Sequence, residues 1–526
     1  MVDKYYSNSW LNITSELVDK GLAEDQELSS FNEMLSSPDK ENHFLAQEII
    51  KLRIEEAYIK GLNKDQQAAF LGLVKFIRDP EDYEGAVLKG YAGTGKTYLI
   101  NRFVEYLTKA YPNRKIAVTA PTNKAVKVLS QGKSFSESNV IKAKHNVDTV
   151  QYGTIHSLLG LKQKIGRDGT ISFVRDKTKS DLSGVKYIIV DESSMLSNEL
   201  YGLINQHKGN IDVIYMGDPA QIPPVNEEYS KPFDENNPDK MFKLELTEIM
   251  RQKGNNPIIN RSMHLRENLT IKDPLMNLGS VKTDDGRILI LNAKTEREHI
   301  RPLINKLYNS DEFRSNHDYI KTIAYRNNSV KYLNKVIREE LYGKEYGDQR
   351  FVENELLIAN SPILDAYGKI IANTSSEFRV IEFKDRVKTF KPGQAKGVLM
   401  GKLQSIELNG ISIRVKNLAA GTANDESVLW VVAEEDLEKY QNYLARLKKT
   451  AIAGTVKNWI DYYDACNLNN NIDYAYAITA HKSQGSTYDN VLFIEEDLSV
   501  NYKTVEKNRI IYTAYTRAKN SLYILK

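Results

Sequence analysis

The sequence predicts an α/β protein with two parallel-sheet domains, a projecting β-hairpin and a small β-barrel insertion. Short β-rich runs alternate with helical stretches in two clusters, and this alternation is typical of parallel sheets with right-handed crossovers. Because a long middle region separates the two clusters, we expect two domains rather than one large sheet. The runs are 86–89, 115–119, 187–190 and 213–216, then 319–324, 474–478, 490–494 and 521–525.

Composition restricts the class of protein. The 526 residues suffice for two to four domains, with 41% apolar and 27% charged residues. No stretch approaches ~18 uninterrupted apolar residues, and the N-terminus lacks the apolar core of a signal peptide, so we expect a cytoplasmic protein without a membrane partner. The lone cysteine, Cys466, excludes an intrachain disulfide and a Cys-based zinc cluster. A net charge of +3 neither requires nor excludes a polyanionic partner.

Residues 1–60 are predicted to form a helical extension, with one amphipathic helix over 41–60, and their function is not readable from the sequence. A further helix begins within 62–70, where Asn63 suits an N-cap and Gln66 occupies the third helical position. Gln66 has two interpretations: its amide completes the cap, or it reads the donor–acceptor edge of adenine.

A phosphate-binding loop is predicted at Gly90–Thr97, which spells G-x-x-x-x-G-K-T between an apolar run and a helix-like segment. Glycines allow several backbone N–H groups to point at a β-phosphate, and the following helix contributes its dipole. Lys96 then reaches the β- and γ-oxygens, and the Thr97 hydroxyl binds Mg²⁺. The loop residues expected to bind a nucleoside triphosphate are Gly90, Ala92, Gly93, Thr94, Gly95, Lys96 and Thr97.

Two further polar groups follow predicted strands of the first cluster. Asp191 and Glu192 come directly after the run Tyr187–Val190, where Asp191 can complete the Mg²⁺ shell beside Thr97 and Glu192 can deprotonate the attacking water. Gln221 lies in a loop stiffened by one glycine and three prolines, and it can contact the γ-phosphate. The plainer interpretations are a solvated acidic helix start and an ordinary proline-rich turn.

Two insertions interrupt the α/β pattern. Around 160–180, an Asp168-Gly169 pair lies between β-compatible residues and predicts a hairpin with a two-residue turn. From about 361 to 455, short strands and the pair Asn409-Gly410, interpreted as a second hairpin turn, predict the small β-barrel.

Hydroxyl, amide and imidazole side chains follow several strand-like runs. Such groups suit contacts to nucleic-acid phosphates, although each is equally compatible with capping or turn chemistry. The stretches are Ala120–Ala125, Thr154–Ser157 and Thr479–Thr487. Phosphoryl transfer also requires cations on the developing charge, and Arg251 and Arg517 are candidates, although each alone is as well explained as a surface arginine.

Taken together and in this order, the motifs resemble those of superfamily 1 DNA helicases of the RecD/Dda-like branch, over roughly residues 62–526. The segments that carry the resemblance are Leu62–Phe70, Gly90–Thr97, Ala120–Ala125, Thr154–Ser157, Asp191–Ser194, Gly217–Val225, Leu246–Gln252, Ala324–Val330, Thr479–Thr487 and Tyr512–Ala518.

The resemblance implies two RecA-like domains with ATP and Mg²⁺ between them. It places the helical extension at 1–60, the first domain at 61–250 with its hairpin, the second at 251–360 and 456–526, and an Src-homology-3-like barrel at 361–455. Lys96, Asp191, Glu192, Gln221, Arg251 and Arg517 become catalytic, Gln66 and Gly485 join the nucleotide site, and Thr97 and Asp191 hold the metal.

The resemblance also implies single-stranded DNA across both domains, translocation from 5′ to 3′, and a hairpin that splits the duplex. It leaves room for a single-stranded-DNA-binding or replication protein as a partner, and it implies a monomer in the cytoplasm, which for a phage-encoded chain is the host cytoplasm. The hairpin tip lacks an aromatic residue, so base stacking there would fall to Phe173. The DNA-contacting residues are then Pro121, Thr122, Asn123, Thr154, His156, Phe173, Thr479, His481 and Ser483.

Two alternatives stay open at this point. A nucleotide-switched clamp would bind nucleic acid without unwinding it, although Glu192 then lacks a purpose because a switch needs no fast hydrolysis. A translocase on RNA would use the same phosphate contacts.

Overall fold

The computed structural model describes most of the chain. The described residues are 24–37, 39–121, 149–166, 170–175, 182–248, 256–275, 278–292, 300–343, 349–364, 370–391, 405–418, 426–454 and 456–526, together with Ile13, Ser15, Val126 and Asp168.

The first domain is built on a six-stranded sheet in which all neighbouring strands are parallel, in the order β3-β2-β6-β7-β1-β8. Strand β1 lies inside this sheet, and its side chains alternate between two cores: Leu88 packs with helices α4 and α5, and Val87 packs with α9. The strands are β1 (Gly85–Gly90), β2 (Lys115–Ala120), β3 (Val150–Thr154), β6 (Val185–Val190), β7 (Asp212–Gly217) and β8 (Met241–Leu246), and the helices are α4 (Lys64–Arg78), α5 (Lys96–Ala110), α8 (Ile155–Leu158) and α9 (Asn198–His207).

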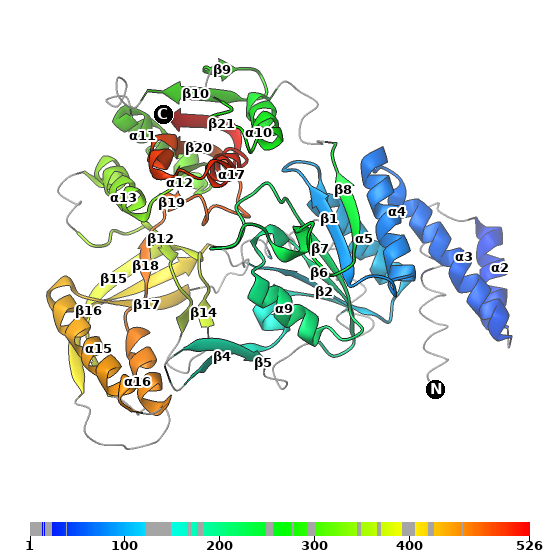
Figure 1. Ribbon diagram of the computed structural model, residues 1–526, viewed down its shortest axis with the longest axis horizontal. Helices are drawn as coiled ribbons and strands as arrows, with labels where there is room; N and C mark the ends of the chain where they lie inside the picture. Colours follow the sequence, from blue (N-terminus) through cyan, green and yellow to red (C-terminus); the bar gives the residue numbers. More distant parts are fainter. Residues whose placement is uncertain are drawn as a thin grey trace.

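The second domain contains another six-stranded sheet, β19-β11-β20-β21-β10-β9, which is parallel except for the β9–β10 pair at its edge. The two sheets confirm the predicted α/β class. They lie in different parts of the molecule, and each is packed with its own helices (Figure 1). The strands are β9 (Val281–Lys282), β10 (Arg287–Leu291), β11 (Ile320–Ala324), β19 (Ala477–Thr479), β20 (Tyr488–Ile494) and β21 (Ala518–Leu525), and the helices are α10 (Pro257–Glu267), α11 (Ile300–Tyr308), α12 (Asp311–Ser315), α13 (Asn327–Tyr342) and α17 (Thr504–Tyr515).

The described part of the N-terminal extension includes helices α2 (Asp25–Ser36) and α3 (Lys40–Ile59), at the side of the first domain (Figure 1). Ile50 and Ile54 of α3 are buried in the core shared with α4 and α5. The Arg102 guanidinium donates hydrogen bonds to the carbonyls of Tyr58 and Lys60, at 3.1 and 2.9 Å. The extension is therefore an integral layer of the first domain.

The predicted hairpin is present as β4 (Leu161–Ile165) and β5 (Ile171–Arg175), which pair antiparallel. Its turn is longer than the two residues expected. The Gly166 N–H bonds to the Thr170 carbonyl at 2.8 Å, and the Asp168 carboxylate accepts from the Thr170 N–H and hydroxyl at 3.1 and 2.8 Å. The side chain of Asp168 thus organises a wider turn.

The insertion predicted as a barrel is built on the antiparallel order β17-β16-β15-β12-β18, with the short pair β13–β14 beside it. Strand β12 precedes the range 361–455 and β18 follows it, so the sheet extends beyond that range on both sides. The stretch Val398–Met400 lies outside the described residues. The elements are β12 (Leu356–Ala359), β13 (Ile363–Leu364), β14 (Ile370–Ala372), β15 (Glu377–Phe390), β16 (Ile406–Asn417), β17 (Glu426–Val432), β18 (Ile472–Tyr474), α15 (Leu437–Ile452) and α16 (Val456–Cys466).

The prediction that Asn409-Gly410 forms a hairpin turn is wrong, because both residues lie inside strand β16. Gly410 is required there by packing: a Cβ atom at this position would lie 2.3 Å from Cζ2 of Trp430. The Asn409 N–H bonds to the Asp436 carboxylate at 2.6 Å. A neighbouring indole, not turn geometry, explains this glycine.

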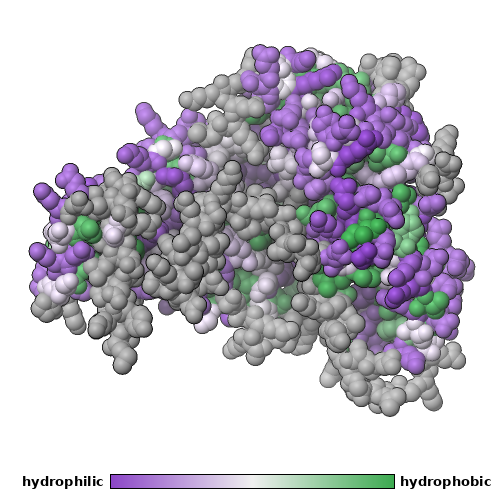
Figure 2. Space-filling model, turned by 180° about the vertical axis from the view of Figure 1, so that it is seen from behind, coloured by the Kyte–Doolittle hydropathy of each residue, from purple (hydrophilic) through white to green (hydrophobic). Residues whose placement is uncertain are grey.

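No helix among the described residues is long and apolar enough to cross a bilayer. The coloured part of the face seen from behind is mostly hydrophilic, with smaller hydrophobic areas (Figure 2). Phe383, Val387 and Val428 are exposed on strands β15 and β17.

Candidate active site

The loop Gly90–Thr97 connects β1 to α5, as the sequence predicts. Gly93 and Gly95 have φ angles of 88° and 80°, in the left-handed region that favours glycine. A Cβ atom on Gly90 would lie 2.9 Å from Lys96 Cγ and from Thr94 Oγ1. The glycines therefore permit the tight loop that a phosphate cradle requires.

Lys96 and Gln66 both contact the loop. The Lys96 ammonium donates to the carbonyls of Gly90 and Tyr91 at 2.6 and 2.9 Å. Gln66 forms the predicted capping box with Asn63, and its Nε2 donates to the Thr94 carbonyl at 3.2 Å. The capping interpretation of Gln66 is thus confirmed, and adenine recognition stays a prediction.

Asp191 and Glu192 directly follow β6, at the carboxyl end of this interior strand. The Asp191 carboxylate is buried and accepts a 2.7 Å hydrogen bond from the Glu192 N–H. Glu192 has a φ of 49°, an uncommon left-handed backbone for a residue with a side chain. Such local strain persists where the surrounding structure imposes it.

Burial and the neighbouring Glu192 charge raise the pKa of Asp191 to about 7, and Lys96 opposes the shift. A buried carboxylate beside a second acid is a suitable ligand for a hard cation, because the cation offsets their repulsion. Asp191 and Thr97 therefore fit the predicted Mg²⁺ site in chemical character.

The second domain contributes Arg517, at the end of α17. Its guanidinium is buried and donates to the carbonyls of Thr513 and Ser486, both at 3.1 Å. Its Nη2 also lies 3.4 Å from Oε1 of Gln221, which belongs to the first domain. Two of the predicted catalytic residues, about 300 positions apart, thus meet across the cleft.

The loop around Gln221 makes further contacts with the second domain. The Ile222 N–H bonds to the Thr513 hydroxyl at 3.2 Å, and the Gln484 amide donates to the Ile222 carbonyl at 2.8 Å. Gly485 follows with a φ of 70°. The predicted Arg251 lies outside the described residues.

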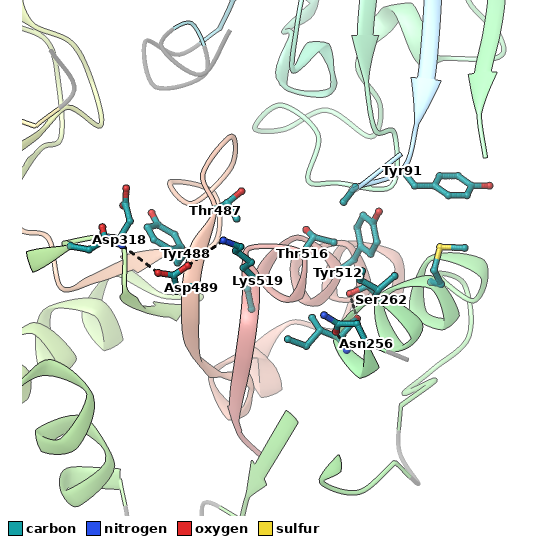
Figure 3. Close-up of a pocket in the computed structure, with 16 residues that line it drawn as sticks. Tyr91, Asn256, Ser262, Asp318, Thr487, Tyr488, Asp489, Tyr512, Thr516 and Lys519 are labelled. Carbon is teal, nitrogen blue, oxygen red and sulfur yellow. Dashed lines mark hydrogen bonds and ion pairs between the residues drawn. The ribbon is translucent and has the colours of Figure 1, made fainter. Parts of the chain in front are cut away.

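A cavity of about 410 Å³ lies between the domains. Tyr91 of the phosphate loop lies on one side, and Tyr512 and Thr516 of the second domain lie on the other (Figure 3). Ala92 of the loop also lines the cavity. Residues from helix α10 complete one wall. The phosphate loop therefore faces the second domain across an open space.

Three of the predicted DNA-contacting residues of the first domain, Thr154, His156 and Phe173, lie in or beside the hairpin. The Thr154 hydroxyl caps α8, accepting from the Ser157 N–H at 3.3 Å. The His156 ring packs edge-on against Phe173 of β5, with centroids 4.9 Å apart, and burial lowers the pKa of His156. Pro121 follows β2, whereas Thr122 and Asn123 lie outside the described residues.

The corresponding residues of the second domain follow β19. Thr479 Oγ1 accepts from the Lys482 N–H at 3.3 Å, and Ser483 Oγ donates to the Ala480 carbonyl at 2.7 Å. Burial lowers the pKa of His481, which favours the neutral form of the ring. These local bonds are the capping chemistry that the sequence left open, and DNA contact stays a prediction.

Sequence reasoning assigned no role to Tyr91, Asp218, Arg266 or Tyr512. The Asp218 carboxylate is fully buried and accepts a 2.5 Å hydrogen bond from Tyr512. Arg266 Nε lies 3.4 Å from the other Asp218 oxygen. Asp218 and Tyr512 fall inside quoted motifs, but no sequence signal indicates Arg266.

Comparisons with known proteins find matches in both parts of the chain that form this site. A family model described as "AAA domain" matches residues 61–285, and one described as "UvrD-like helicase C-terminal domain" matches 474–525. The chain is 25% identical over 485 residues to "ATP-dependent DNA helicase dda" of Enterobacteria phage T4, covering 88% of this chain and 98% of that one. It is 23% identical to "RecBCD enzyme subunit RecD" of Buchnera aphidicola, covering 83% and 69%. These matches support a superfamily 1 helicase of the Dda/RecD-like branch.

The solved structure "Crystal structure of Pif1 helicase from Candida albicans" matches 88% of this chain and 94% of its own at 16% identity, with a TM-score of 0.42. The matched segment 61–285 begins at the helix of Gln66 and contains the phosphate loop, Asp191 and Gln221. The matched segment 474–525 contains Arg517. The two models therefore cover the two sides of the cleft.

Proposed function

We propose that this helicase hydrolyses ATP to move along single-stranded DNA from 5′ to 3′ and thereby unwinds duplex DNA. The observation that carries the proposal is the contact between Gln221 and Arg517, which joins the hydrolytic residues of one domain to a buried cation of the other. Full-length similarity to a phage DNA helicase supports DNA as the track.

In this proposal the residues of each domain have separate tasks. The loop amides and Lys96 bind the triphosphate, and Asp191 and Thr97 hold Mg²⁺, which supplies charge stabilisation when bound. Glu192 accepts the proton of the attacking water. Arg517 and Arg251 stabilise the charge that develops on the transferred phosphoryl group, so hydrolysis depends on closure of the cleft.

Closure would also move the two DNA-binding surfaces. The segments 154–157 and 479–487 belong to different domains, so a strand that contacts both is pulled when the domains approach. The loop 217–225 connects ATP hydrolysis to the movement of the DNA strand. Its residue Gln221 contacts Arg517, and its residue Ile222 bonds to Thr513 and Gln484.

The hairpin β4–β5 is the proposed wedge that separates the duplex. It contacts helix α16 of the insertion, which lies beside it in Figure 1. Midway along the hairpin, Phe173 packs against His156 of the adjoining segment. The wedge is thus supported by the first domain and by the insertion, which suits an element that must withstand the force of the duplex.

An unwinding assay on 5′-tailed and 3′-tailed duplex DNA tests the proposal. We expect ATP-dependent strand separation on the 5′-tailed substrate and none with a non-hydrolysable analogue. Unwinding of the 3′-tailed substrate alone would show that translocation runs from 3′ to 5′, opposite to the proposal. Tight binding without separation would favour the clamp, and equal ATPase stimulation by matched RNA would favour an RNA track.

Variants connect the assay to the site. Lys96→Ala and Glu192→Gln should abolish DNA-stimulated ATPase activity, and Arg517→Ala should retain ATP binding but lose turnover by about 10³-fold or more. Arg314→Ala is the matched control, because this exposed arginine pairs only with Asp311 among the described residues. We further propose a cytoplasmic monomer, which sedimentation at working concentration would check.

A further inference from the structure

We propose that Arg266 is a positioning residue that links the second domain to the phosphate loop, so that ATP affinity depends on closure of the cleft. The inference rests on the proposed ATPase function and adds a residue to it.

Arg266 belongs to helix α10 but contacts two loops of the first domain. Its Cζ lies 3.6 Å from the centroid of the Tyr91 ring, and its Nε lies 3.4 Å from Asp218 Oδ1. The side chain is only 15% exposed, so its cation–π contact and its ion pair are weakly screened.

Tyr91 connects this contact to the nucleotide loop. Its carbonyl accepts hydrogen bonds from Lys96 Nζ at 2.9 Å, from Thr94 Oγ1 at 3.0 Å and from the Thr94 N–H at 3.3 Å. Tyr91 therefore contacts Arg266 through its ring and positions Thr94 and Lys96 through its carbonyl. Displacement of the ring would disturb the backbone that positions Lys96.

Asp218 connects Arg266 to the second loop. Its buried carboxylate accepts from Tyr512 at 2.5 Å and from the Ala220 N–H at 3.1 Å. It lies three residues before Gln221, which contacts Arg517. Arg266 and Tyr512, both from the second domain, thus hold one carboxylate of the first.

Helix α10 is fixed within the second domain. Ile258 and Leu265 are buried in the core that also contains α17 and the strands of that sheet, and α10 contacts α17, β10 and β21. The helix must therefore move with its domain, and an opening of the cleft would withdraw Arg266 from Tyr91 and Asp218 together. Nucleotide affinity should fall when this happens.

Steady-state ATPase measurements at saturating single-stranded DNA test the inference. We expect Arg266→Ala to raise KM for ATP by about tenfold and to change kcat by less than about threefold. Tyr91→Leu should have a similar effect, and the double variant should be no worse than either single variant, because both remove the same contact. Arg266→Lys keeps the charge over the ring and should lie between Arg266→Ala and the unmodified protein.

Controls separate positioning from loss of fold. Thermal unfolding identifies misfolded variants, and Arg266→Lys replaces Arg266→Ala if the latter does not fold. Arg314→Ala should leave KM unchanged. A KM for Arg266→Ala within twofold of the unmodified value, additive effects in the double variant, or a fall in kcat at unchanged KM would overturn the inference.

Failure of the proposed function gives a different result. If the unmodified protein shows no DNA-stimulated ATPase activity, the proposed function fails, and direct binding of a fluorescent ADP analogue then tests Arg266 independently. A tenfold weaker affinity in Arg266→Ala would support the link between Arg266 and the loop, and an unchanged affinity would overturn it.

Discussion

Glu192 adopts a left-handed backbone at the end of a buried strand, and this conformation turns the chain immediately after Asp191. For a residue with a side chain, the left-handed backbone conformation costs of order 1 kcal/mol. The sequence predicted the chemistry of Glu192 from its position after an apolar run, but not its backbone, because β6 and the following turn impose the angle.

Two replacements of Glu192 should distinguish the effect of its backbone strain on stability from the effect of its carboxylate charge. Glu192→Gly and Glu192→Gln both remove the carboxylate, so both should abolish ATPase activity and relieve repulsion of Asp191. Only glycine also relieves the strain, so Glu192→Gly should be more stable than Glu192→Gln by about 1 kcal/mol. Urea denaturation of the two variants measures the difference, and equal stability would contradict the strain.

Strand β16 shows how packing determines an element. Asn-Gly pairs favour two-residue turns, yet Gly410 lies within a strand because the Trp430 ring covers it. Local sequence preference was overridden by a contact between residues 20 positions apart.

We expect Gly410→Ala to lower the free energy of unfolding by about 1–3 kcal/mol, because the added methyl group would meet both the indole and the Val431 carbonyl. Gly202→Ala is the matched control. No atom lies within 4 Å of a Cβ placed on Gly202 in helix α9, so alanine there should stabilise the protein by about 0.5–1 kcal/mol. Thermal unfolding midpoints compare the two variants.

The start of helix α13 depends on one carboxylate. Asp497 accepts hydrogen bonds from the N–H groups of Tyr325 and Arg326, from Arg326 Nε and from the Ser329 hydroxyl, at 2.6–2.9 Å. Burial alone would raise the pKa of Asp497, but these donors outweigh it and lower the pKa below its ordinary value. The ionised carboxylate therefore stabilises the folded state.

Asp497→Asn should cost about 2 kcal/mol of stability at pH 7. Because the folded-state pKa is lowered, the stabilisation is complete above the ordinary pKa of about 4 and is lost as pH falls below it. Urea denaturation from pH 7 to below pH 4 should therefore show a stability difference between the two proteins that is constant down to about pH 4 and narrows below it. Asp311→Asn, at an exposed carboxylate of α12, should show little effect.

The insertion is joined to the second domain by a buried ion pair. Arg338 of α13 donates through Nε to the fully buried Glu355 and through Nη2 to the Gln349 carbonyl at 2.7 Å, with Tyr474 under its guanidinium at 4.1 Å. These contacts fix the insertion sheet, and with it α16 beside the hairpin, to the second domain.

We expect Arg338→Met to destabilise the protein by about 3–5 kcal/mol, because it leaves the Glu355 carboxylate buried and uncompensated. Adding Glu355→Leu should restore much of the loss. Arg301→Met, which removes an exposed arginine paired with Glu339 and Glu340, should cost less than about 1 kcal/mol. Chemical denaturation compares the variants. An Arg338→Met effect as small as that of Arg301→Met would contradict a stabilising role for the Arg338–Glu355 ion pair.

Much of this protein could be predicted from its sequence alone. The β-rich runs of both sheets, the capped helix at Asn63, the glycine loop and the hairpin are local patterns, and local backbone geometry follows from nearby residues. Strands β3 and β8 were not among the predicted runs, because polar residues interrupt their apolar ones. Strand β10 was also missed, although Ile288–Leu291 is a continuous apolar run.

The sequence by itself determined the two parallel sheets, the phosphate loop and the acidic pair after β6, because each depends on residues close together in the chain. Only the tertiary structure decided that the N-terminal helices share the first core, that Gly410 lies under an indole, and that Arg266 reaches both Tyr91 and Asp218. The physical reason is distance along the chain: contacts between separate elements depend on how the sheets and helices pack, and no short pattern records that packing.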